Sequence, residues 1–220
     1  EHLVSLQHIN KVMAKKKTIS ANDIITWYMD DVLEHNNQPK SVYTFSKAHN
    51  FEEPLFYEHF GSFEAIEKRI FKAFFDNTIT LLDKNLDYNT YDSRNKLLAF
   101  YFTFFENLTA NRSYVVYALN KHKNRLKNLT VLSELKYHFS IYIDQLEIET
   151  IDFKQAEIEK FPNKVIGESA WFQLLITIKF WYTTINNFRR DKQIIVNFLF
   201  IVTYRRNYFA FNSNFNIGFY

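Results

Sequence analysis

Residues Asn50–Ile66 read N-F-E-E-P-L-F-Y-E-H-F-G-S-F-E-A-I, and this stretch decides the fold. Pro54 suits the first turn of a helix, because the N–H that proline lacks is one that a helix leaves unpaired there. Ser62 suits the N-cap of another helix, since its hydroxyl accepts a hydrogen bond from a first-turn N–H. The stretch therefore predicts a short helix, a tight connection and the start of a long helix over about residues 63–84.

A further helix is predicted upstream, from Ser20 to about Asn36. Ser20 suits its N-cap, and Asp23 stands three residues later as a capping-box partner. Apolar side chains then recur every four residues, as on one face of a helix: Ile24, Tyr28 and Val32. Asn36-Asn37 ends the helix, because asparagine tolerates the left-handed conformation of a C-cap.

A short helix over residues 42–49 is predicted between these two parts. Ser41 caps it, and Asn50 makes the turn toward the helix that Pro54 begins. These residues therefore predict a short helix, a tight turn and a second short helix.

The quoted stretch resembles the L-Y-Y-H-F-x-S-K-E signature of TetR-family regulators. The matching residues are Tyr57, His59, Phe60, Ser62 and Glu64, and upstream Ser41, Phe45, Ser46, Asn50 and Phe51 fall on the family's T-x-x-x-I-A-x-x-A-G-V pattern. The resemblance is specific over roughly residues 20–75. It implies an all-α fold, with a three-helix helix-turn-helix domain and a C-terminal helical bundle that binds a ligand and dimerises.

The departures from the family pattern fall on the expected recognition helix. Glu52 and Glu53 replace small polar residues, and Phe63 replaces the lysine that usually reaches a phosphate. Seven acids and two bases lie between Ser20 and Ser62, a formal charge of −5. Because DNA binding requires positive charge, a TetR-like protein that does not bind DNA is the alternative reading.

Composition limits the other classes. Three glycines and three prolines leave few tight turns, which favours helices over sheets. With no cysteine, disulfides, thiolate metal sites and cysteine nucleophiles are excluded. Neither a secretory signal nor a run of about 20 apolar residues is evident, so we expect a cytoplasmic protein without a membrane span. No catalytic, metal or cofactor motif stands out, and we expect no enzyme and no cofactor.

Beyond the first domain, helices are predicted over about residues 94–109, 112–120, 130–151, 163–186 and 191–204, with Ser93 as the cap of the first. A basic connection covers residues 121–128. The predicted organisation is a flexible extension over 1–19, the helix-turn-helix domain over 20–64, the ligand-binding and dimerisation domain over 65–206, and an irregular tail over 207–220.

The resemblance implies three sets of candidate residues. Double-stranded DNA is contacted by Lys40, Ser41, Lys47, Leu55, Tyr57 and His59. A small hydrophobic ligand is surrounded by Phe71, Phe74, Phe75, Tyr101, Phe104, Phe105, Tyr114, Tyr117, Phe139 and Tyr142, although the same rings also suit a filled core. A homodimer forms through Trp171, Leu174, Leu175, Ile178, Trp181, Ile194 and Phe198.

Two hypotheses follow. The first is a homodimeric TetR-like transcriptional regulator that binds DNA and is controlled by the ligand. The second keeps the fold without DNA binding, as a carrier of hydrophobic ligands such as lipids or as a protein-interaction module.

Overall fold

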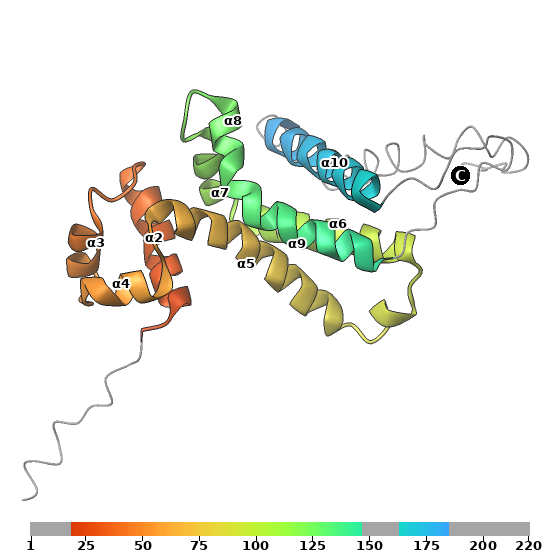
Figure 1. Cartoon of the computed structure of the whole chain (residues 1–220), viewed down its shortest axis with the longest axis horizontal. Coiled ribbons are helices and arrows are strands. Elements are labelled where there is room, and N and C mark those ends of the chain that lie inside the picture. Colours follow the sequence, from red (N-terminus) through yellow and green to blue (C-terminus); the bar gives the residue numbers. More distant parts are fainter. Residues whose placement is uncertain (1–18, 147–162, 185–220) are drawn as a thin grey trace, which may run out of the picture. The chain divides into compact units, whose positions relative to one another are not determined.

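The computed structural model describes residues 19–146 and 163–184. Within these ranges all regular secondary structure is α-helix or 3-10 helix, and there is no strand (Figure 1). This confirms the predicted all-α class. The elements are α2 (Ala21–His35), α3 (Val42–Ala48), α4 (Glu53–His59), α5 (Phe63–Asp83), η1 (Tyr88–Thr90), α6 (Ser93–Ala110), α7 (Arg112–Asn120), α8 (Arg125–Asn128), η2 (Leu129–Leu132), α9 (Ser133–Gln145) and α10 (Asn163–Thr184).

Several predicted segments lie outside the described residues. They are the N-terminal extension up to residue 18, the helix over 191–204 and the tail over 207–220. In the part of the chain that is described, no helix is long and apolar enough to cross a membrane.

The predicted helix ends in the first domain are confirmed. Ser20 and Asp23 form a reciprocal capping box at α2, with the Ser20 N–H donating to Asp23 Oδ2 at 2.9 Å. Asn36 ends α2 in the left-handed conformation (φ 49°), and Asn50 turns the chain after α3 with φ 55°. Ser62 accepts a hydrogen bond from the Ala65 N–H at the start of α5. Each of these helix ends is encoded by side chains within a few residues of it.

Three expectations in the second half are corrected. Asp92 caps α6, because its Oδ1 accepts the Asn95 N–H at 2.7 Å, whereas Ser93 Oγ donates to the Leu146 carbonyl. The predicted basic connection contains a turn of helix, α8. The helix predicted from residue 130 begins as the 3-10 helix η2 and becomes α-helical at Ser133.

The chain divides into two compact units. Among the described residues, unit 1 contains 19–76 and 105–134, and unit 2 contains 77–104, 135–146 and 163–184. Unit 1 thus holds the predicted helix-turn-helix together with α7, which packs against α2. The predicted division at residue 64 stays a prediction.

Unit 1 has an aromatic core centred on Phe45 of α3, which is 1% exposed. Its ring meets the rings of Phe51, Phe56 and Phe63 edge-on, with centroids 5.7, 6.2 and 5.7 Å away. Edge-to-face pairs of this kind add to the stability gained from apolar burial. This one ring therefore fixes α3, α4 and the start of α5 together.

Unit 2 has a core of its own around Phe100 of α6. The Phe100 ring stacks on Phe104 at 5.4 Å, and Phe139 of α9 lies 5.3 Å away. Tyr142 closes this core with its hydroxyl 2.9 Å from that of Tyr88, and it also donates to the Lys96 carbonyl. Helix α10 covers Phe139 with Trp171, whose ring centroid is 6.5 Å away.

Candidate functional site

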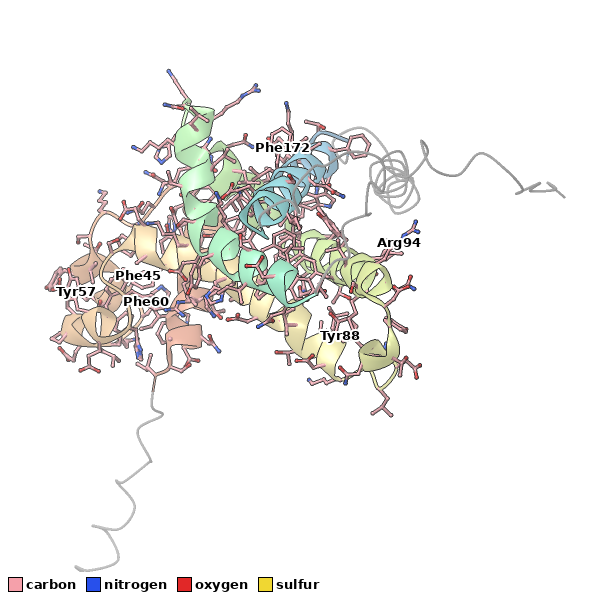
Figure 2. The ribbon with its side chains drawn as sticks, turned by 45° about the vertical axis from the view of Figure 1, so that its right-hand side comes forward. Phe45, Tyr57, Phe60, Tyr88, Arg94 and Phe172 are labelled. Atoms are coloured by element: carbon pink, nitrogen blue, oxygen red, sulfur yellow. The ribbon has the colours of Figure 1, made fainter. Side chains whose placement is uncertain are left out.

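The helix-turn-helix consists of α3, the turn at Asn50 and α4. Figure 2 shows Phe45 inside this part of unit 1 and Tyr57 at its outer edge. Of the six residues predicted to contact DNA, five are exposed and Leu55 is half-buried; the exposed ones are Lys40, Ser41, Lys47, Tyr57 and His59. Their accessibility agrees with a contact surface, and their role in DNA binding stays a prediction.

Ser41 and Lys47 already have partners within the chain. Ser41 Oγ accepts the Thr44 N–H at 3.2 Å and so caps α3. Lys47 Nζ lies 5.8 Å from the centre of the Tyr43 ring, which leaves the cation exposed beside an aromatic face.

The outer surface of α4 is acidic. Glu52 and Glu58 are exposed, Glu53 is half-buried, and the Tyr57 hydroxyl lies 3.5 Å from Glu53 Oε1. Glu53, Pro54, Tyr57 and Glu58 line an open hollow of about 470 Å³. The acids stabilise the N-terminal end of a helix, but the same charges repel a phosphate backbone.

Phe63, which stands where the family has a phosphate-contacting lysine, belongs to the core. Its side chain is 6% exposed and its ring stacks on Tyr28, with centroids 5.4 Å apart. Residue 63 therefore cannot serve as a contact to DNA in this chain.

His49 is also structural. Its Nε2 lies 3.1 Å from Asp31 Oδ1, and its ring stacks on Trp27 at 5.1 Å. These contacts join α3 to α2. In the residues that the structure describes, no three His, Asp or Glu side chains gather as they would around a metal ion.

A buried polar cluster, which sequence reasoning missed, ties α2, α5 and α7 together inside unit 1. Glu67 is 2% exposed, and its Oε1 accepts the Tyr28 hydroxyl at 2.6 Å and Lys121 Nζ at 2.7 Å. Lys121 Nζ also donates to Gln38 Oε1 at 2.6 Å. The available signal for this cluster was the position of Glu67 in α5, among apolar residues such as Ile66 and Ile70 that are buried. Its partner could not be found, because Lys121 lies 54 residues away.

The tyrosines around Glu67 are held neutral. Burial, followed by the charge of Glu67, raises the pKa of Tyr28 and of Tyr114 well above the usual value, and raises that of Tyr117 to about 12. The Tyr28 hydroxyl donates a hydrogen bond to Glu67, but the buried Tyr114 hydroxyl has no hydrogen-bond partner among the described residues. Burying a hydroxyl without a hydrogen bond lowers the stability of the fold. A polar group that enters the cluster would therefore bond to the Tyr114 hydroxyl first.

The residues predicted to surround a ligand fall into two groups. Unit 1 holds Phe71, Phe74, Phe75, Phe105, Tyr114 and Tyr117, and unit 2 holds Tyr101, Phe104, Phe139 and Tyr142. In unit 1, Phe71 lies between Phe74 and Tyr114, with ring centroids 5.8 and 6.4 Å away. In unit 2 the rings pack around Phe100. Each group is an aromatic core within its unit, and ligand binding by these rings stays a prediction.

The residues predicted for a dimer interface lie mostly on the inner side of α10. Trp171, Leu174, Ile178 and Trp181 are 8%, 0%, 4% and 1% exposed, and Leu175 is half-buried. Ile194 and Phe198 lie outside the described residues. The exposed large apolar side chains of α10 are Phe172 (64%) and Ile176 (39%), one helical turn apart; Figure 2 shows Phe172 on the outer side of α10.

Comparison with protein families decides what kind of protein this is. The family model of the tetracyclin repressor-like C-terminal domain matches residues 96–204. The chain belongs to the TetR family. The family match begins beyond the residues that carry the N-terminal signature, so the two similarities are independent. No curated protein and no solved structure matches the chain significantly. The fold is accordingly all-α and TetR-like.

Proposed function

We propose that this TetR-family protein is a homodimeric transcriptional regulator that binds DNA through α3 and α4 and responds to a small hydrophobic ligand. The observation that carries the proposal is the capped helix-turn-helix with an exposed second helix, in a chain that also has a TetR-type C-terminal domain. In this arrangement Tyr57 and His59 face the base edges. Lys40, Ser41 and Lys47 lie near the phosphates.

The aromatic residues of α5, α6, α7 and α9 support binding of an apolar ligand. Rings supply an apolar surface, and a few polar groups fix the orientation of what binds. Tyr114 supports this role most directly, because its buried hydroxyl has no partner among the described residues.

For the dimer we propose contact through the outer side of α10. Phe172 and Ile176 are exposed there, whereas Trp171 and Trp181 are already buried in unit 2. Because they are four residues apart on one helix, Phe172 and Ile176 are neighbours and together offer an apolar contact surface. This revises the contact residues within α10 and keeps the helix that the sequence indicated.

A second candidate function, a TetR-like protein without DNA binding, is favoured by one observation. The exposed side of α4 carries Glu52 and Glu58, with Glu53 beside them. Such a protein would carry a hydrophobic ligand or bind another protein through this face.

An electrophoretic shift with the DNA upstream of the protein's own gene separates the two candidates. A regulator retards this DNA more strongly than a shuffled duplex, at both 50 and 150 mM salt. Tyr57→Ala should weaken the retardation, whereas Tyr137→Ala, at another exposed tyrosine, in unit 2, should not. Equal retardation of both duplexes that disappears at the higher salt would contradict the regulator.

A further inference from the structure

A basic turn in unit 1 presents an exposed leucine. Lys123, Arg125 and Lys127 are exposed, and Leu126 between them is 76% exposed. We call these four residues the basic knob. The basic knob offers apolar area and positive charge at one point, and such charge suits a partner surface that is acidic.

The side chains of Asn124 and Asn128 brace the backbone of the basic knob through hydrogen bonds. Asn128 is 3% exposed, and its side chain bonds both backbone groups of His122: Nδ2 donates to the carbonyl at 2.8 Å and Oδ1 accepts the N–H at 2.7 Å. Asn124 Oδ1 accepts the Leu126 N–H at 3.0 Å. A turn that is ordered before binding avoids much of the entropic cost of association.

The hollow on α4 is complementary to this knob. It is a wide-open hollow lined by Pro54 and Tyr57 together with the acids Glu53 and Glu58, and exposed Glu52 stands next to it in sequence. We call Glu53, Pro54, Tyr57 and Glu58 the acidic hollow. Its volume of about 470 Å³ readily admits a leucine side chain.

We propose that the basic knob of one copy of this chain docks into the acidic hollow of a second copy. Leu126 enters the hollow between Pro54 and Tyr57, while Arg125 and Lys127 face Glu53 and Glu58. Within unit 1, α4 and α8 lie at separate ends (Figure 1), so the knob of a chain is not positioned to fill the hollow of the same chain. The knob of a second copy supplies Arg125 and Lys127, cations that complement the acids of the hollow, and we therefore take a second copy as the occupant.

This contact joins two different patches and so has consequences for assembly. Two copies can engage reciprocally, knob to hollow and hollow to knob, as a two-fold pair, or the contact can extend from copy to copy. It also covers α4, so a copy engaged in this way does not present its helix-turn-helix to DNA. The proposal goes beyond the proposed function and does not depend on it.

Disulfide trapping tests the contact in the full-length chain, which contains no cysteine of its own. Leu126→Cys and Pro54→Cys are made separately, and equal amounts are mixed under mild oxidation. A mixed disulfide is expected in the mixture, because docking brings the two Cα atoms within about 7 Å. Tyr137→Cys, which is also exposed but lies in unit 2, is the control partner. Cross-linking of Leu126→Cys to Pro54→Cys no faster than to Tyr137→Cys would overturn the proposal.

Charge reversal tests the complementarity independently. Adding Glu58→Lys to the Pro54→Cys chain, or Lys127→Glu to the Leu126→Cys chain, should slow cross-linking about tenfold, and combining the two should restore it. Raising salt from 50 to 500 mM should slow the parent pair, because exposed charges are screened. If neither reversal changes the rate, the acidic hollow takes another occupant, such as a different basic protein, and the proposal fails.

Discussion

The ion pair between Glu67 and Lys121 is a strong determinant of the stability of unit 1, and removing the cation tests this. Lys121→Met keeps an unbranched side chain of nearly the same length and leaves the Glu67 carboxylate, 2% exposed, with the Tyr28 hydroxyl as its remaining partner among the described residues. The pair is short, at 2.7 Å, and Lys121 is only 15% exposed. Breaking a buried pair of this kind costs about 3–5 kcal/mol, because the remaining charge stays buried without compensation.

Urea unfolding followed by circular dichroism and tryptophan fluorescence measures this loss. With a slope of about 1–3 kcal/mol per molar urea, the midpoint should fall by about 1 M or more. Lys123→Met, two residues away and exposed, is the matched control and should change stability by less than about 0.5 kcal/mol. The double variant Glu67→Gln/Lys121→Met should recover most of the loss, because glutamine still accepts the Tyr28 hydroxyl but carries no charge. A Lys121→Met midpoint equal to that of Lys123→Met, or a double variant as unstable as Lys121→Met, would refute the reasoning.

Three further predictions concern the buried tyrosines and α10. Because the pKa of Tyr28 and of Tyr114 is raised in the folded chain, the unfolded chain loses these protons first, near pH 10. The free energy of unfolding, measured by urea titration at pH 8 and again above pH 10, should therefore be highest at pH 8 and fall as the pH rises above 10. Tyr114→Phe should raise the free energy of unfolding at pH 7 by about 1–3 kcal/mol by removing an unpaired hydroxyl, and a loss would show that the hydroxyl has a partner. In sedimentation, Phe172→Glu should give a folded monomer, whereas Trp171→Glu should unfold unit 2 because it buries a charge. If Phe172→Glu still sediments as a dimer, the outer side of α10 is not the interface.

The parts of the fold that the sequence predicted correctly are those with local causes. Ser20 with Asp23, the left-handed Asn36 and Asn50, and Ser62 act within a few residues of the helix ends that they determine. Their geometry needs no information about the rest of the chain, because a cap is a bond between a side chain and a nearby backbone group.

The errors and omissions have non-local causes. Glu67 and Lys121 pair across 54 residues, and periodicity carries no information on such a partner. Phe63 aligns with a surface lysine, yet its ring packs on Tyr28, so an aromatic at that position was the sign of burial rather than of a lost phosphate contact.

Helix α10 shows a third limit. It has apolar residues on more than one side, so its sequence did not reveal which side packs against the other helices of unit 2. The structure buries Trp171 and Trp181 and exposes Phe172. An amphipathic pattern identifies a buried face only when the other face is polar.

The most direct test of the proposed DNA contact is the affinity for operator DNA after the acids that open α4 are removed. Glu52→Ser/Glu53→Thr takes away two negative charges per chain, four per dimer, at the start of a helix that is proposed to face phosphates. Fluorescence anisotropy with the upstream DNA and with a shuffled duplex, at 50 to 200 mM salt, gives the affinity for each. A DNA-reading regulator should bind its own site about tenfold more tightly after the substitution and keep its preference over the shuffled duplex. An unchanged affinity for the specific site, or a gain that is equal for both duplexes, would contradict the proposal that α4 reads DNA.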